Sequence, residues 1–232
     1  MALTPVRDSP RAAGVVYEEL RGRLISGQFR QGERISVEPL KAEFSVSKQP
    51  IMEALRLLSA DGLVDIIPQV GSVVATYPRR EIADFFDMFA GFEGAIAAAA
   101  ANRRSVDQLD EIDLVSRRLE RLLSVPNSHE RSVEYLKLNR DFHTTIHRMS
   151  GSRIMASSSR RLWDLSDFLI NTSGSTDPLS TATGNRHGEH EEIRQALIDG
   201  DAERARTEME HHIRETVRVL ERETPAPVAS NT

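Results

Sequence analysis

The sequence contains no cysteine, which excludes disulfide frameworks, thiol catalysis and zinc sites built from cysteine. It also lacks long hydrophobic runs, since the longest, 95–101, is far below the roughly 18 residues of a membrane-spanning helix. The first 20 residues carry charges throughout and no apolar signal core, so we expect a cytoplasmic protein with no membrane partner. The residues that are present, 39% hydrophobic and 28% charged, are typical of a globular chain with a buried core and exclude disorder as the main state.

Charge is distributed unevenly along the 232 residues. Residues 1–80 contain 11 Lys/Arg and 9 Asp/Glu, a net charge of +2, whereas the remainder carries −7 and brings the total to −5. All seven histidines lie at or beyond His129. This contrast predicts two domains, 10–77 and 78–222, followed by a flexible tail over 223–232. Because the net charge repels phosphate, any nucleic-acid binding requires basic residues that are concentrated locally.

The pattern of the first domain predicts three short helices followed by a hairpin. Apolar residues that recur every four positions predict an amphipathic helix over about 12–26, and a shorter pattern follows over 37–44. Ser47 then stands as an N-cap at the start of a third helix. Two β-branched runs, 63–67 and 72–75, flank a Pro/Gly turn and predict the hairpin. This order is typical of a winged helix-turn-helix, whose third helix can enter the DNA major groove.

The third helix is expected to bury one face and to present the other for contact with DNA. Lys48, Gln49, Met52 and Arg56 project from the face opposite the apolar residues. Arginine reads guanine through a bidentate fork, whereas lysine offers a point charge and methionine only apolar contact. The alternative for Met52 and Arg56 is an exposed side chain with no role in DNA binding.

The segment from Tyr17 to Ala75 resembles the DNA-binding domain of GntR-type bacterial regulators. The matching motifs stand in the family's order and spacing: Gly27, Gly32-Glu33-Arg34-Ile35, Val46-Ser47-Lys48-Gln49-Pro50-Ile51-Met52-Glu53-Ala54-Leu55, Asp61-Gly62-Leu63-Val64 and Gly71. The resemblance implies a DNA-binding regulator whose expected contacts are Arg34, Ser47, Lys48, Gln49, Met52, Arg56 and Gly71. For Arg34 the alternative is a solvated surface charge. Lys48 and Met52 stand where the family usually carries arginines, so the family's usual operator core is not carried over.

The second domain is predicted to contain only helices. Six segments with helical periodicity, joined mostly by short links, predict an antiparallel bundle, so the fold class is mainly α. The expected helices span about 82–102, 105–123, 131–149, 153–169, 187–198 and 202–221, with a Ser/Thr/Gly-rich loop over 171–184.

Three of these helices each place a histidine at the margin of a buried face. At about 100° per residue, His143, His190 and His212 border the apolar stripes, whereas His147 falls farther out. One interpretation is a divalent metal site inside the bundle, because imidazole is the commonest ligand for zinc, nickel and similar ions. The other is three half-buried histidines that are satisfied by hydrogen bonds.

Residues 81–222 resemble FCD, the all-helical ligand-binding domain of FadR-like GntR regulators. The motifs are Asn139-Arg140-Asp141-Phe142-His143, His190-Glu191-Glu192-Ile193, Gly200-Asp201 and Met209-Glu210-His211-His212-Ile213. By this resemblance the metal ligands are Asn139, His143, His190 and His212, and the ion is zinc, nickel or manganese. Asn139 replaces the usual aspartate, which implies a lower affinity or a different preferred metal.

The same resemblance implies a small effector, expected to be a carboxylic acid. Family members carry an arginine four residues before a glutamate on the first FCD helix, and the arginine helps to hold the effector. Glu93 matches the glutamate, but Phe89 occupies the position of the arginine. Arg140, Arg160 and Arg161 are the candidate substitutes, with exposed surface positions as the alternative.

We therefore expect a ligand-responsive regulator that binds a near-palindromic operator as a homodimer. One alternative is a regulator with a purely structural metal, or with no metal and no effector. Another is a metalloenzyme of the bundle, which would need a general base near the metal. Asp141 projects away from His143, and no His-Glu-x-x-His motif is present, so we do not expect an enzyme.

Overall fold

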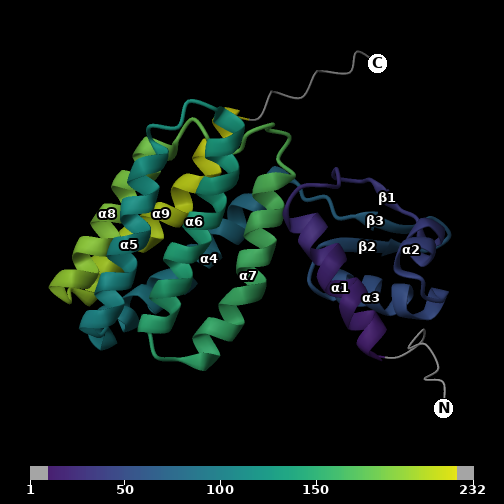
Figure 1. The fold of residues 1–232 in the computed structure, drawn as a ribbon, viewed down its shortest axis with the longest axis horizontal. Coiled ribbons are helices and arrows are strands. Elements are labelled where there is room, and N and C mark those ends of the chain that lie inside the picture. The colour runs from purple at the N-terminus through teal and green to yellow at the C-terminus, as the bar shows by residue number, and fades with distance from the viewer. Residues whose placement is uncertain (1–9, 224–232) are drawn as a thin grey trace. The chain divides into compact units, whose positions relative to one another are not determined.

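The computed structural model describes residues 10–223, in which nine helices and three short strands occur (Figure 1). The elements in chain order are α1 (Pro10–Ile25), β1 (Arg34–Ile35), α2 (Val37–Phe44), α3 (Lys48–Ala60), β2 (Val64–Ile67), β3 (Gly71–Val74), α4 (Arg79–Arg103), α5 (Val106–Leu122), α6 (Ser128–Met149), α7 (Arg153–Asn171), α8 (Thr183–Asp199) and α9 (Ala202–Glu223). The predicted fold class is confirmed. The tail predicted for 223–232 lies outside the described residues except for Glu223.

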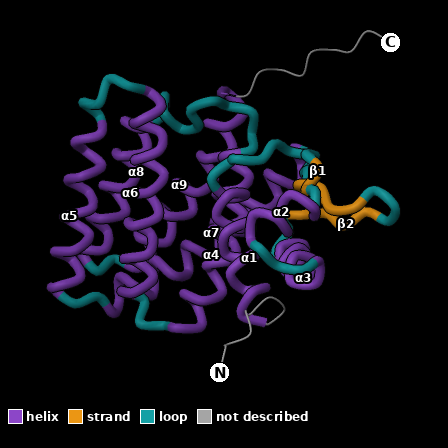
Figure 2. The backbone as a smooth tube through the Cα atoms, turned by 45° about the vertical axis from the view of Figure 1, so that its right-hand side comes forward, coloured by secondary structure: helices purple, strands orange, loops and turns teal. Residues whose placement is uncertain are grey.

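The chain divides into two compact units. One holds the chain up to Tyr77 together with Asp164–Thr172, and the other holds Pro78–Trp163 and the residues from Ser173 onward. Figure 2 shows that the strands belong to the first unit and that the second consists of helices and loops. Among the described residues, no helix combines the length and the low charge that crossing a bilayer requires.

The first unit is a winged helix-turn-helix with a three-stranded sheet in the order β1-β3-β2. β2 and β3 form the predicted antiparallel hairpin, with Val64 opposite Val74. β1 was not predicted, because two residues are too short to show an alternating pattern, and it pairs Arg34 with Val73. The side chain of Ser47 accepts a hydrogen bond from the Gln49 backbone, as expected of an N-cap.

The six helices predicted for the second domain are α4 to α9, and all but Asp164–Asn171 of α7 belong to the second unit. The largest correction concerns α8, which begins at Thr183 rather than near His187 and so extends into the segment predicted to be a loop. Gly184 and the surrounding Ser and Thr residues favoured a loop there. α8 packs against α5 and α9, and α6 packs against α4 and α5, so buried faces of α6, α8 and α9 surround one interior region.

Candidate functional site

The three histidines predicted from helix periodicity meet inside the second unit. His143 on α6, His190 on α8 and His212 on α9 are each fully buried, and their ligand atoms lie within 4.8 Å of one another. The Nε2 atom of His212 is 3.3 Å from that of His143 and 3.1 Å from that of His190. The bundle therefore aims three imidazole nitrogens at one point.

The spacing and protonation of these rings suit a divalent metal ion. Metal–nitrogen bonds of about 2.0–2.1 Å place tetrahedral ligands roughly 3.4 Å apart, close to the observed separations. Burial holds the pKa of all three imidazoles well below the ordinary value, and the neighbouring charges of Arg186 and the other histidines lower it further. The rings are therefore neutral at physiological pH, which is the form that can donate a lone pair to a metal.

The Nδ1 atoms on the far side of the rings show how each imidazole is held. His212 Nδ1 lies 2.8 Å from a carboxylate oxygen of Glu189, an arrangement that fixes the proton on Nδ1 and turns the Nε2 lone pair toward the other histidines. The Nδ1 atoms of His143 and His190 are buried without a hydrogen-bond partner among the described residues. For His143 the nearest charged partner is Glu93, whose carboxylate lies 3.9 Å away.

Asn139 lies on the same helix as His143, one turn earlier, and is buried. Its side-chain oxygen accepts a hydrogen bond from the Tyr135 hydroxyl at 3.3 Å, and the Tyr135 ring stacks on His190. The neutral amide oxygen is thus linked to His190 through the Tyr135 side chain.

An arginine that the sequence analysis did not single out lies at the centre of this site. Arg186 is 2% exposed, and one of its terminal nitrogens, Nη2, is 3.1 Å from His212 Nε2. Its position four residues before His190 is the signal that could have found it, because residues four apart share a helix face. The sequence predicts a helix that begins only near His187, which leaves Arg186 outside it.

One of the three arginines proposed from the sequence lies next to the site, and the other two do not. Arg140 on α6 is half-buried, and its guanidinium lies 5.6 Å from the centre of the Trp163 ring, which in turn contacts His143. Arg160 and Arg161 are exposed on α7. Of the three, Arg140 is the one that reaches the site, through the indole ring.

A buried polar cluster next to the histidines was also missed. Glu93 on α4 is fully buried and pairs with His147 at 2.8 Å and with the Ser159 hydroxyl. The sequence placed His147 away from the apolar face, but the ring is buried because this carboxylate compensates its polar atoms. The cluster fixes the carboxylate that faces His143 Nδ1.

Four of the residues predicted to contact DNA lie on α3 of the first unit. Lys48, Gln49 and Arg56 are exposed on α3, and Met52 between them is half-buried. The opposite face of the helix packs Ile51 and Leu55 into the core, where both are fully buried. The core thus fixes the rotation of α3 and leaves a polar face on which Lys48 and Arg56 are exposed to solvent.

The wing between β2 and β3 has an apolar surface rather than a basic one. Residues 63–76 contain no lysine, arginine or histidine, and Ile66, Ile67 and Val70 are each more than 40% exposed. Arg34 of β1 brings a cation to this region, since a Cβ at Gly71 would lie 3.8 Å from its guanidinium. Arg34 is thus the one basic residue within the three described strands.

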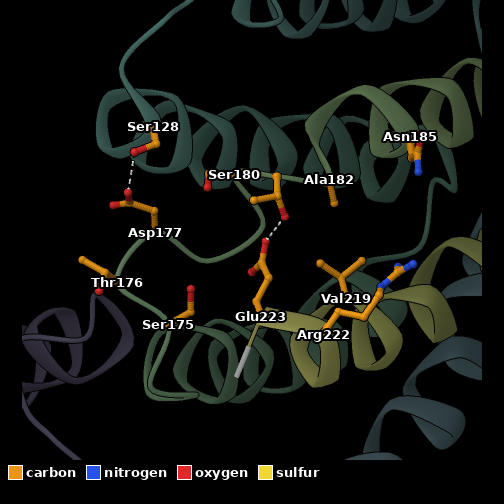
Figure 3. A pocket seen from close by; sticks show the side chains of 11 residues that line it. Ser128, Ser175, Thr176, Asp177, Ser180, Ala182, Asn185, Val219, Arg222 and Glu223 are labelled. Carbon is orange, nitrogen blue, oxygen red and sulfur yellow. Dashed lines mark hydrogen bonds between the residues drawn. The ribbon is translucent and has the colours of Figure 1, made fainter. Parts of the chain in front are cut away.

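A cavity of about 600 Å³ opens beside the loop before α8 and is lined largely by hydroxyl groups and acids (Figure 3). Its carboxylates already have partners within the chain. Ser128 donates to Asp177 at 2.6 Å, and Thr181 donates to Glu223. None of the three buried histidines lines this cavity, so it is separate from the candidate metal centre.

Comparison with known proteins agrees with both halves of the structure. Residues 12–74 match the model of bacterial regulatory proteins of the gntR family, and residues 84–215 match that of the FCD domain. The HTH-type transcriptional repressor GlaR of Escherichia coli is 25% identical over 88% of this chain and 94% of its own length. The gluconate operon transcriptional repressor of Bacillus licheniformis is 33% identical over 55% of this chain and 51% of its own.

Solved structures show the same fold. Escherichia coli McbR/YncC superposes with a TM-score of 0.75 at 17% identity, covering 91% of this chain and 97% of its own. A GntR transcriptional regulator from Rhodococcus sp. RHA1 reaches 0.72 at 19% identity, covering 94% of this chain and all of its own.

Proposed function

The chain belongs to the GntR family of DNA-binding transcriptional regulators with an FCD domain, and we propose that a small carboxylic acid, bound beside a divalent metal ion, controls its affinity for operator DNA. In this proposal residues 10–77 read the DNA, and residues 78–222 bind metal and effector and pair two copies of the chain. The regulator acts in the cytoplasm as a homodimer on a near-palindromic operator. The related proteins are named as regulators, so the chain is not assigned an enzymatic activity.

The observation that carries the proposal is the convergence of three buried, neutral imidazoles on one point. Three imidazoles buried in the middle of a bundle are costly unless their lone pairs are used. Asn139, His143, His190 and His212 are the residues that would hold zinc, nickel or manganese. When bound, the metal supplies a Lewis acid that can hold a carboxylate oxygen.

The chain's own residues would recognise the rest of the acid. Arg186 places a guanidinium at the histidines, and Arg140 stands behind Trp163. An effector that fits one geometry of the paired domains better than the other shifts DNA affinity by that difference in binding free energy. The rival proposal, a purely structural metal or none, predicts DNA affinity that no acid changes.

The first experiment tests the metal. Metal analysis and thermal melting of the purified protein, before and after chelation, are compared with those of His143→Ala and of His211→Ala. His211 is exposed and adjacent to His212 on the same helix, so its variant is the matched control. We expect stoichiometric metal and a chelator-sensitive melting temperature in the wild type and in His211→Ala, and neither in His143→Ala. Metal-free wild-type protein with an unchanged melt would contradict the metal site.

The second experiment tests the effector. Operator DNA is selected from genomic fragments, and its affinity for metal-loaded protein is measured with a panel of acids that includes gluconate, chosen because of the Bacillus relative's name. We expect at least one acid to change operator affinity by about 5- to 150-fold, the usual range of allosteric coupling. An unchanged affinity across the panel would favour the structural role of the metal.

A further inference from the structure

Arg186 uses all of its hydrogen-bonding capacity inside the bundle. A guanidinium has five N–H donors and no acceptor. Nε donates to the Tyr135 hydroxyl at 3.3 Å, and Nη1 donates to the His212 backbone oxygen at 2.6 Å and to Glu189 at 3.0 Å. Nη2 donates to the Thr216 hydroxyl at 3.0 Å and lies 3.1 Å from His212 Nε2. The side chain is therefore held firmly against the ring that would ligate a metal.

The contact between Arg186 and His212 has only one chemical interpretation. Because the guanidinium cannot accept, His212 Nε2 must be the acceptor, and the ring proton must lie on Nδ1, where Glu189 receives it. A neutral imidazole has a single lone pair in the ring plane. Arg186 and a metal ion therefore require the same lone pair of His212.

The guanidinium beside His212 Nε2 opposes a second cation, while the carboxylates of Glu93 and Glu189, next to the Nδ1 atoms of His143 and His212, compensate part of its charge. The imidazoles and Asn139 are neutral, and the buried guanidinium adds a positive charge whose repulsion for a divalent ion is strengthened by the low dielectric of the interior. Glu189 compensates this charge in part at 3.0 Å. An anion at the same place relieves the repulsion, because a carboxylate can accept from the guanidinium with one oxygen and bind a metal with the other.

We propose that Arg186 couples the metal to the effector: its guanidinium caps the His212 lone pair until a carboxylate draws it away, so that metal and acid bind cooperatively. This inference rests on the proposed function, since it concerns the same metal site and effector. It differs from that proposal in predicting a weak metal site without acid and in assigning the coupling to one side chain. By linkage, the factor by which the acid raises metal affinity equals the factor by which the metal raises acid affinity.

The test measures zinc affinity of the full chain by competition with a chelator, with acetate as the minimal carboxylate and acetamide as its uncharged isostere. We expect saturating acetate to tighten zinc binding by about 5- to 150-fold, within the usual range of coupling, and acetamide to have no effect. Arg186→Gln should bind zinc more tightly than the wild type without acetate and should show no acetate effect. Arg194→Gln is the matched control, because Arg194 lies on the same helix but pairs with Glu191 and Asp113.

The possible outcomes distinguish a failure of the proposed metal site from a failure of the proposed coupling by Arg186. Wild-type protein that binds no zinc contradicts the proposed metal site itself. Zinc binding that acetate leaves unchanged, or an acetate effect that persists in Arg186→Gln, overturns the coupling and leaves the metal site intact. If circular dichroism shows that Arg186→Gln does not fold, Arg186→Lys replaces it, since the ammonium keeps the charge but loses the planar fork, and we expect a reduced acetate effect.

Discussion

His212 differs from the other two histidines because both of its ring nitrogens have partners. Glu189 accepts from Nδ1 at 2.8 Å, while the corresponding atoms of His143 and His190 have no hydrogen-bond partner among the described residues. A carboxylate behind a ligating histidine fixes the tautomer and raises the basicity of the ring. Glu189 therefore makes the His212 lone pair the most strongly basic of the three, both toward Arg186, which contacts it now, and toward a metal.

Replacement of Glu189 by glutamine should weaken zinc binding by about 10- to 100-fold, the usual effect of losing a carboxylate behind a metal-ligating histidine. The measurement is chelator competition in buffer without carboxylic acids, which keeps the effector out of the result. Glu192→Gln is the control, because Glu192 lies on the exposed side of the same helix and pairs with Arg204. Equal zinc affinities for the two variants would contradict a role for Glu189 in orienting His212.

Periodicity predicted which histidines meet, and it failed where burial depends on a distant partner. His143, His190 and His212 follow the apolar stripe of their own helices, so each could be found from its own segment. His147 lies outside that stripe and is buried only because Glu93, from another helix, pairs with it at 2.8 Å. A pairing between residues 54 positions apart leaves no signal in a single sequence.

α4 and α9 approach closely at a glycine in the middle of α4. A Cβ at Gly94 would lie 2.7 Å from Glu210 Cγ and 3.2 Å from the Arg206 backbone oxygen, so a larger side chain must move α9. Gly91, one turn earlier on the same helix, has nothing within 4 Å of such an atom. Alanine at either position gains the same helix propensity, but only alanine at Gly94 meets the atoms of α9. A comparison of the two variants therefore isolates the cost of close packing.

Gly94→Ala should destabilise the protein by about 1–2 kcal/mol, because overpacking costs about 1–3 kcal/mol and alanine returns up to about 1 kcal/mol of helix propensity. Gly91→Ala should be neutral or stabilising by about 0.5–1 kcal/mol. Thermal melting of both variants checks this, with about 2–4 °C expected for each kcal/mol in a chain of this size. A Gly94→Ala melt at or above that of Gly91→Ala would contradict the close packing of α4 on α9.

The exposed cations of α3 should dominate recognition of DNA. Lys48→Gln or Arg56→Gln should weaken operator binding by about 1–3 kcal/mol if the side chain reads a base. A phosphate contact would instead make the replacement weaken binding to all DNA sequences about equally. It would also reduce the slope of log affinity against log salt concentration by about one. Affinities for selected and unrelated DNA at several salt concentrations distinguish the two contacts. Lys41→Gln on α2, where Lys41 pairs with Glu38, is the control and should leave operator affinity unchanged.

The beginning of α8 shows how element boundaries limit the prediction of a site. Composition favours a loop up to Gly184 and the predicted helix begins near His187, so Arg186 falls outside both. In the structure α8 begins at Thr183, which places Arg186 one turn before His190. Tertiary packing against α5 and α9 overrides the low helix propensity of this segment, and no local signal reports such packing.

Across the whole molecule, the distribution of charge requires that DNA contact be local. The chain carries a net charge of −5, yet its first 80 residues carry +2, and the wing contributes no cation of its own. The exposed face of one α3 helix, with Lys48 and Arg56, can make only a few phosphate contacts. Phosphate contacts supply a large share of the affinity of a protein for DNA. Two copies on one site double those contacts, which is the physical reason to expect a homodimer.

A dimer of this kind predicts the symmetry and spacing of the operator. DNA selected by the full-length protein should contain an inverted repeat whose half-sites lie about one helical turn, or a multiple of it, apart, because two recognition helices must enter the major groove on the same side of the duplex. Inserting about five base pairs between the half-sites turns one of them to the opposite side and should reduce affinity nearly to that of unrelated DNA, whereas inserting about ten should restore part of it. Mobility shifts with these operators, together with a measured stoichiometry of two chains per site, test the arrangement. Full affinity for an isolated half-site, bound by one chain, would show that the protein reads DNA as a monomer.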